Sequence, residues 1–350
     1  MPDQHPFFSV TVLAWQVEAY LEACLLSVQA QTYTDFEAIL VMPPSSDGTE
    51  AICRRFAAQD ARFTVCETQN RGQLLNRLSG FSKSRGEYLL CLDGDDLWKP
   101  ELLQTLYDAL SQSAADVLIF GHECFSDDRL LRVVTDVFPD RSVFRGDEKK
   151  AVYRKHIQGA AINEVCCKVF RKSLLARMGV DWTPYETIRF SEDLLFTCYL
   201  ADAAQSIQYL SAPLYRYRIR PDSIVHTFRE GELREHYLVR EAVRSFLPRW
   251  DMDTPDNRAL FYGSLARYTA DWIFRCAVSE LPFQKKQVLY RWLKNEAPFF
   301  PEIAASLEAS VPTKRHRLFV RLFFENEKLL ERYAKTYRRF RSLFGQHENR

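Results

Sequence analysis

Three carboxylates stand within four residues of the chain, in the segment Asp93-Gly94-Asp95-Asp96. Carboxylates this close repel one another unless a cation neutralises them. Hard divalent cations such as Mg²⁺ bind carboxylate oxygen and keep coordination sites open for phosphate oxygens. Gly94, between the acids, would let the backbone approach a ligand closely. The segment therefore predicts a metal site for a phosphate-bearing ligand, with a solvated acidic turn that caps the next helix as the alternative.

A second acidic pair, Glu192 and Asp193, follows Ser191 and precedes an apolar stretch. Serine is a preferred N-cap residue, and acidic side chains in the first turn interact favourably with the helix dipole. Taken alone, these residue types favour an ordinary helix start over a catalytic carboxylate.

Short apolar runs and stretches of helical periodicity alternate through the first 121 residues. We expect strands at 8–15, 36–42, 63–66, 88–92 and 117–121, and helices at 17–30, 49–60, 73–84 and 100–111, the last with Pro100 at its first position. This rhythm predicts an α/β fold with a mostly parallel sheet and helices on both faces. Ligands of such sheets bind beyond the carboxyl ends of the strands. The fourth strand runs directly into Asp93, so the acidic segment is expected where a ligand would lie.

The rest of the chain suggests a second architecture. Residues 122–226 mix polar turns with short apolar segments, whereas the chain from about 228 onward reads as nearly all helix. We therefore expect a catalytic domain over 1–226, with halves at about 1–121 and 122–226, and an α-helical C-terminal region over 227–350.

The segment 314–341 contains ten Lys or Arg residues and three Glu residues. Leu318, Leu322, Leu329, Tyr333 and Phe340 are expected roughly along one side of a helix. One interpretation is a helix packed on the catalytic domain with a solvated basic face. The other is a helix that binds the anionic surface of a membrane. Nucleic-acid binding is not expected, because no recognised module accompanies the charge.

Composition limits the classes of protein. Of the 350 residues, 47% are hydrophobic and 27% charged, and the formal net charge is +1; this is ordinary globular composition without a field that attracts nucleic acid. The nine cysteines include no CxxC pair, which is typical of buried thiols in a reducing compartment. We expect neither a secretory signal nor a membrane-spanning run, and a location in the cytoplasm or peripherally on the inner face of the cell membrane.

Four stretches carry a resemblance to a known family: SVTVLAWQVEAYLEACLLSVQAQTYTDFEAILV, SKSRGEYLLCLDGDDLWKPELL, VCCKVFRKSLL and FSEDLLFTCYLADAAQSIQYLSAPLYRYRIRPDSI. Over about residues 8–226 the chain resembles the family-2 glycosyltransferases of the GT-A fold, which are mostly bacterial. The resemblance implies an inverting hexosyltransferase that moves a sugar from a nucleotide-diphosphate donor to an acceptor hydroxyl. The acceptor class it implies is a polysaccharide or a lipid-linked glycan of the cell envelope.

The resemblance also implies roles for the acidic residues. Asp95 would be the principal ligand of Mn²⁺ or Mg²⁺. Asp93 would touch the ribose, the donor sugar or the metal, and Asp96 would support the loop or the sugar hydroxyls. Asp193 would be the catalytic base, with Glu192 as the alternative.

Basic residues complete the implied donor site. Arg77 lies where the family often places an Arg that contacts the nucleotide or its phosphates, the alternative being an Arg on a helix surface. Arg218 and Arg220 could close over the diphosphate. His226 could do the same or bind the metal, although a lone His is more often structural.

The chain departs from the family pattern in two places. Leu13-Ala14-Trp15-Gln16 replaces the usual Pro-x-Tyr-Asn-like turn, and Met42-Pro43 stands where the family has an Asp that pairs with the nucleotide base. Backbone groups or Asp47 would have to substitute. A non-catalytic scaffold with a degenerate donor site therefore stays open. A nucleotidyltransferase is less favoured, because the segment 16–20 offers no Gly-rich basic loop for a triphosphate.

Overall fold

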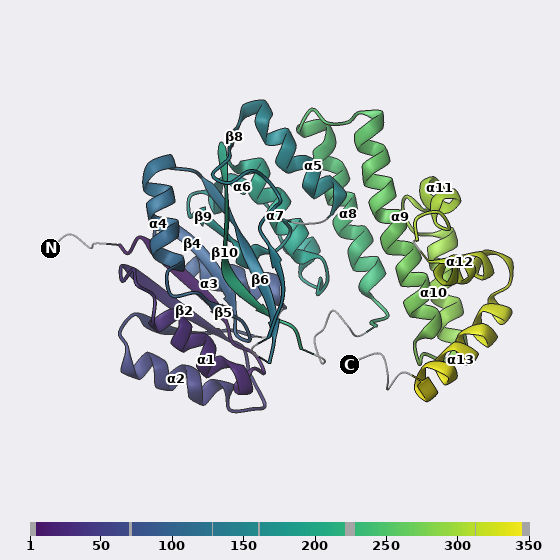
Figure 1. Ribbon diagram of the computed structural model, residues 1–350, viewed down its shortest axis with the longest axis horizontal. Coiled ribbons are helices and arrows are strands. Elements are labelled where there is room, and N and C mark those ends of the chain that lie inside the picture. Colours follow the sequence, from purple (N-terminus) through teal and green to yellow (C-terminus); the bar gives the residue numbers. More distant parts are fainter. Residues whose placement is uncertain are drawn as a thin grey trace. The chain divides into compact units, whose positions relative to one another are not determined.

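The computed structural model describes residues 5–69, 72–127, 129–159, 162–220, 228–311 and 313–344, with side chains described as far as residue 340 in the last helix. The chain divides into two compact units (Figure 1). Unit 1 comprises Met1–His156 with Ala160–Ser223, and unit 2 comprises Ile157–Gly159 with Ile224–Arg350. Each unit is described by itself.

Unit 1 is built on a sheet flanked by helices, which confirms the predicted α/β class (Figure 1). The parallel part has the order β3-β2-β1-β4, formed by β1 (Phe8–Leu13), β2 (Phe36–Met42), β3 (Phe63–Glu67) and β4 (Tyr88–Asp93). β9 (Lys168–Arg171) then lies antiparallel between β4 and β6 (Val117–Ser126), and β10 (Ser206–Arg218) runs parallel to β6. The sheet is therefore mixed, and β4, which leads into the acidic segment, pairs parallel with β1 and antiparallel with β9.

Three shorter strands lie at the margins of the sheet. β5 (Leu97–Trp98) and β8 (Val143–Arg145) pair antiparallel with β10, and β7 (Arg129–Val134) pairs antiparallel with β6. Every residue of β2 is buried, as expected of a central strand covered on both faces.

The helices of unit 1 connect these strands. They are α1 (Glu18–Gln29), α2 (Thr49–Gln59), α3 (Gln73–Lys83), α4 (Leu102–Ser113), α5 (Lys150–Gln158), α6 (Leu174–Met178) and α7 (Glu192–Ala203). The prediction that Pro100 occupies the first position of α4 is wrong. The helix begins two residues later, and the Pro100 carbonyl instead accepts a hydrogen bond from the Thr32 backbone N–H at 3.0 Å.

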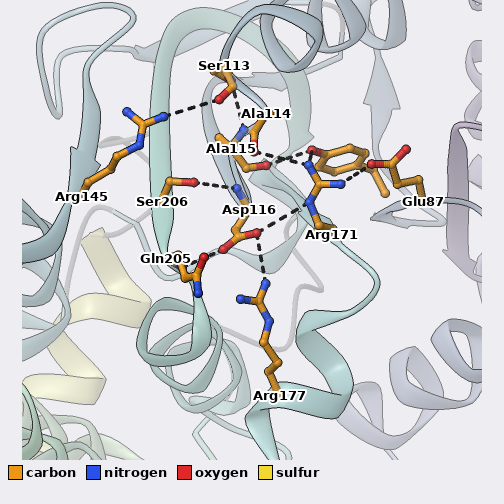
Figure 2. Close-up of polar contacts among 11 residues, drawn as sticks. Glu87, Ser113, Ala114, Ala115, Asp116, Arg145, Arg171, Arg177, Gln205 and Ser206 are labelled. Atoms are coloured by element: carbon orange, nitrogen blue, oxygen red, sulfur yellow. Dashed lines mark hydrogen bonds and ion pairs between the residues drawn. The ribbon is translucent and has the colours of Figure 1, made fainter.

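A network of polar side chains fastens the amino end of the sheet (Figure 2). Asp116 precedes β6 and is 8% exposed. One carboxylate oxygen meets Arg177 Nη2 at 3.0 Å and Arg171 Nε at 3.6 Å, and the other accepts the Gln205 backbone N–H at 2.7 Å. Arg171 also donates to Glu87. We call these side chains the Asp116 network; each charge in it has an opposite charge beside it.

Unit 2 is helical in its described part, as predicted. Its helices are α8 (Glu232–Arg249), α9 (Pro255–Val278), α10 (Phe283–Asn295), α11 (Phe300–Ile303), α12 (Lys314–Glu325) and α13 (Glu327–Phe344). α9 begins with Pro255 at its first position, and the Thr254 side chain caps it by accepting the Asn257 N–H at 3.3 Å. The core of the unit is aromatic and includes the fully buried Trp272.

The segment expected to be one basic helix is two helices, separated at Asn326, whose backbone is extended. The expectation that five apolar residues share one side is therefore wrong. Leu322 is 7% exposed, whereas Leu329 and Phe340 are 47% and 63% exposed.

All nine cysteines lie among the described residues, and each is buried and outside any disulfide. Within the described ranges, none of the helices combines the length and the apolar character needed to cross a bilayer.

Candidate active site

The acidic segment forms a tight turn at the carboxyl end of β4. The Asp96 backbone N–H donates to the Asp93 carbonyl, and the Gly94 N–H to the Leu13 carbonyl, both at 3.0 Å. A Cβ at Gly94 would lie 2.6 Å from that Leu13 oxygen. The glycine therefore permits close contact between the turn and the end of β1, and not the approach of backbone to ligand that the sequence suggested.

Asp96 ties the turn to β10. Its side chain is buried, one oxygen accepts the Tyr215 hydroxyl at 2.6 Å and the other accepts the Arg218 backbone N–H at 2.7 Å. Burial, together with the charges of Asp95 and Asp93, raises the pKa of Asp96 well above its usual value. With both oxygens engaged, Asp96 has the contacts of a residue that supports the loop.

Asp95 faces two arginines from the end of β10. Its carboxylate meets Arg220 Nε at 3.2 Å, and its backbone carbonyl accepts from Arg218 Nε at 2.8 Å. Both guanidinium groups lie 5.1 Å from the centre of the Tyr20 ring. Burial and the neighbouring charge of Asp93 raise the pKa of Asp95. The structure thus brings the predicted Arg218 and Arg220 to the acidic turn, while His226 lies outside the described residues.

Arg77 joins the two predicted acidic groups. Its side chain, on α3, donates from Nη1 to Asp193 and from Nη2 to Asp93 Oδ1 at 3.0 Å. It is 3% exposed, so the reading of Arg77 as an Arg on a helix surface is wrong. Burial acts to lower the pKa of Arg77, but the charges of Asp193 and Asp93 outweigh it and raise the pKa well above its usual value.

The sequence contained a signal for this burial. Leu74, Arg77 and Phe81 recur at the spacing of one helical face, and all three are buried. An arginine within an apolar stripe requires anionic partners, and the two aspartates supply them.

The two acids at the start of α7 differ in their surroundings. Asp193 retains 29% side-chain exposure, and its second oxygen accepts the Val165 N–H at 3.3 Å. Glu192 is 8% exposed, and burial together with the charge of Asp193 raises its pKa. Ser191 occupies the N-cap position of α7 as predicted, but it has a left-handed backbone with φ 64° and its side chain makes no capping hydrogen bond.

A cleft of about 500 Å³ opens beside Arg220, the partner of Asp95. It is lined by Gln16, Val17, Glu18, Ala19, Tyr20, Asp47 and Arg220. Of these residues, the sequence motifs indicate only Asp47 and Arg220 as candidates for donor binding. They do not indicate Gln16 and Tyr20, although both follow the first strand, at the same carboxyl edge as the acidic turn.

Asp47 lines the cleft, but backbone groups already bind both of its oxygens. They accept the N–H groups of Glu18 at 3.0 Å and Thr49 at 3.2 Å. Glu18 in turn accepts the Gly48 N–H at 2.9 Å. These bonds link the loops after β1 and β2 and fix the position of the Asp47 carboxylate, and each of its oxygens keeps a second lone pair.

Asp93 and Asp95 are the residues that suit a divalent cation. Each side chain is 22% exposed, and each faces one guanidinium group. Burial first and the charge of Asp93 second raise the pKa of Asp95, and a cation would relieve the second of these effects. Within the described ranges no three His, Cys, Asp or Glu residues are grouped to hold a metal. The donor set therefore fits a cation held by one or two carboxylates and completed by substrate phosphate oxygens.

Comparisons with known proteins concern the family and the fold. The family model described as "Glycosyl transferase family 2" matches residues 9–179. The "Uncharacterized glycosyltransferase EpsJ" of Bacillus subtilis (strain 168) is 29% identical over 231 residues, which cover 66% of each chain. This chain thus spans about two thirds of the length of that relative.

Two solved structures resemble the fold. The crystal structure of S. aureus TarS 1-349 superposes with a TM-score of 0.62 at 18% identity, covering 95% of this chain and 91% of that chain. The mannosyltransferase PcManGT from Pyrobaculum calidifontis, in complex with GDP-Man and Mn²⁺, gives a TM-score of 0.50 at 16% identity, covering 96% and 88%. These matches confirm the predicted fold, and the family match confirms the predicted class of enzyme. The segment at residues 9–179 is a glycosyltransferase family 2 domain.

Proposed function

We propose that this protein is an inverting, divalent-cation-dependent glycosyltransferase that moves a sugar from a nucleoside-diphosphate donor to a hydroxyl of a glycan or lipid-linked acceptor. The observation that carries the proposal is the buried Arg77, which contacts Asp93 of the acidic turn and Asp193 of α7 at the same time. One guanidinium group thereby sets the distance between the donor-side acid and the candidate base.

Asp193 is the proposed base because it combines exposure with a fixed position. Arg77 and the Val165 N–H each hold one of its oxygens. In the proposed step Asp193 takes the proton of the acceptor hydroxyl while that oxygen attacks the anomeric carbon. The bond from this carbon to the diphosphate breaks, and the diphosphate leaves with the electron pair. A single displacement of this kind inverts the anomeric centre.

The donor side is assigned to the acidic turn and the cleft. Asp95, with Asp93, would hold Mn²⁺ or Mg²⁺, which when bound would supply positive charge against the leaving diphosphate. Arg218 and Arg220 add cationic charge at the same place. The nucleoside would occupy the cleft at Gln16 and Tyr20. Support comes from similar solved structures, in which TarS is in complex with UDP or UDP-GlcNAc and PcManGT is in complex with GDP-Man and Mn²⁺.

A matched pair of substitutions tests the base. In Asp193→Asn the side chain keeps its size and loses its basicity, so transfer should fall by roughly 10²–10⁴-fold while donor binding persists. Glu192→Gln removes the same charge from the same helix end and should lose much less activity. Undiminished transfer by Asp193→Asn, measured with the natural acceptor, would place the base elsewhere.

One observation favours a second candidate, a non-catalytic scaffold with a degenerate donor site. Met42 and Pro43 offer no carboxylate to a nucleobase, and both oxygens of Asp47 are engaged by backbone. Calorimetry with UDP, GDP, CDP and dTDP, each with and without Mn²⁺, separates the two functions. Binding of one nucleotide that strengthens with Mn²⁺ supports the enzyme, and no binding of any nucleotide supports the scaffold.

A further inference from the structure

One face of α13 is strongly basic and exposed. The exposed residues Lys328, Leu329, Arg332, Lys335, Arg339 and Phe340 recur at the spacing of a single helical face. At 100° per residue they fall within an arc of about 140°. The arc contains four cations and no acidic residue, so its charge is not balanced along the helix.

The acids of the described part of α13 lie outside this arc and pair with lysines of α10, and Glu331 Oε1 also lies 3.8 Å from Nζ of Lys335, one of the cations of the arc. Glu331 is 7% exposed and meets Lys286 Nζ at 3.0 Å, and Glu327 meets Lys294 Nζ at 2.8 Å. Lys328 and Arg332 form no ion pair within the part of the chain that the structure describes. The packing of α13 on its neighbours therefore buries Glu331 and leaves the cations of the arc exposed, with Lys335 as the cation beside that acid.

Two large apolar side chains share the arc with the cations. Leu329 is 47% exposed and Phe340 is 63% exposed. They are eleven residues apart, which places them about 16 Å apart along the axis on nearly the same line. An ionic partner made of phosphate and sugar alone gives such side chains no contact, whereas the boundary between lipid headgroups and acyl chains accepts them.

From this arrangement we infer that the exposed face of α13 binds the surface of a membrane rich in anionic lipid. The helix lies parallel to the bilayer, its cations contact lipid phosphates, and Leu329 and Phe340 enter the interface. This inference does not depend on the chemistry proposed for unit 1. It assigns the contact to α13, because the exposed cations and the exposed side chains of Leu329 and Phe340 share one face of that helix.

Sedimentation of the full chain with vesicles tests the inference. The protein should bind vesicles of phosphatidylglycerol and phosphatidylcholine and should not bind phosphatidylcholine alone. The variant Lys328→Glu/Arg332→Glu/Lys335→Glu should weaken the partition coefficient by at least about 100-fold, given the contribution of each cation near such a surface. A matched control reverses three exposed cations of other elements, Lys83→Glu/Arg267→Glu/Arg291→Glu, and should retain most of the binding.

Two results would overturn the inference. Equal binding by the α13 variant and its control would show that the α13 face is not the contact. Binding of heparin or duplex DNA that the α13 variant loses, without binding of anionic vesicles by the parent chain, would identify a polyanion site instead. Should the reversal variant fail to fold, judged by its circular dichroism, the same three positions changed to Gln give the measurement. Transfer to a soluble acceptor should be unchanged in both variants, so a failure here is distinguishable from a failure of the proposed reaction.

Discussion

The two ends of the unit 1 sheet carry the same kinds of side chain in different proportions. At the amino end, the Asp116 network sets two acids, Asp116 and Glu87, against two arginines, Arg171 and Arg177 (Figure 2). At the carboxyl end, five acids meet three arginines. These acids are Asp93, Asp95, Asp96, Glu192 and Asp193, and the arginines are Arg77, Arg218 and Arg220.

This difference distinguishes a structural ion-pair network from a candidate binding site. In the Asp116 network, the acidic and basic side chains neutralise one another, so no ligand is needed. A surplus of negative charge is unfavourable until a cation arrives; burial, and after it the charges of the neighbouring aspartates, raise the pKa of both Asp95 and Asp96. Clusters of acids and arginines therefore do not by themselves indicate a functional site. The excess of acids over arginines at the carboxyl end of the sheet does.

The largest expected effect comes from removing a carboxylate at the unbalanced end. Asp95→Ala should abolish cation-dependent transfer and leave the melting temperature nearly unchanged, because the residue lies on a turn and its loss reduces repulsion. Activity assays across a Mn²⁺ and Mg²⁺ titration, with full chelation as the reference, measure this. Near-normal activity in Asp95→Ala, or activity that survives chelation, would contradict the metal assignment.

An intermediate effect is expected where the site is held together. Arg77→Lys keeps one positive charge, but an ammonium group cannot span Asp93 and Asp193 as the planar guanidinium does. Misplacement of the base by about 1 Å costs up to roughly 10²-fold in rate, so kcat should fall by about that factor while the protein stays folded. If kcat is unchanged and only the Kd of the donor rises, Arg77 acts on the nucleotide alone, as the sequence first suggested.

The smallest effect on catalysis should come from the balanced end. Asp116→Asn removes the acid between Arg171 and Arg177, and it should lower the free energy of unfolding by about 1–3 kcal/mol, with the lower part of that range expected because Arg177 is 36% exposed. The kcat of the folded protein should stay within about twofold of the parent, since the proposed donor site and base lie at the other end of the sheet. Chemical denaturation measures the free energy of unfolding, and steady-state kinetics on the same samples measures kcat. A large kinetic defect in Asp116→Asn would erase the distinction between the two ends.

Much of the fold followed from the sequence because its signals are local. β2 and α3 begin at the predicted residues, since an apolar run and a helical stripe each define their own limits. The pairing of β9 between β4 and β6 is not local; segment 168–171 gives no sign of its direction or its neighbours. Ser191 had the composition of a cap but adopts a left-handed backbone, which composition does not encode.

The sequence predicts many of the residues that form the site, but not the contacts between them. Asp95, Arg218 and Arg220 were selected from separate motifs, and the structure places them together. The role of Asp96 as an anchor needed Tyr215, 119 positions along the chain. The sequence does not show that the Asp47 carboxylate accepts hydrogen bonds from the backbone N–H groups of Glu18 and Thr49. Such contacts depend on loops that meet only in the folded chain.

β10 spans the distance between the two ends of the sheet. Its first residue, Ser206, accepts the Asp116 N–H at 3.1 Å, and its last, Arg218, donates to Asp96. Its pairing with β6 slips on both sides of Pro213, so the strand carries irregularities between these two attachments. Because side chains alternate between faces, losing one residue there would turn Tyr215 away from Asp96 while leaving Ser206 in place. The number of residues in β10 therefore determines whether both attachments can form at once. Point substitutions along the strand should be far better tolerated over evolutionary time than insertions or deletions.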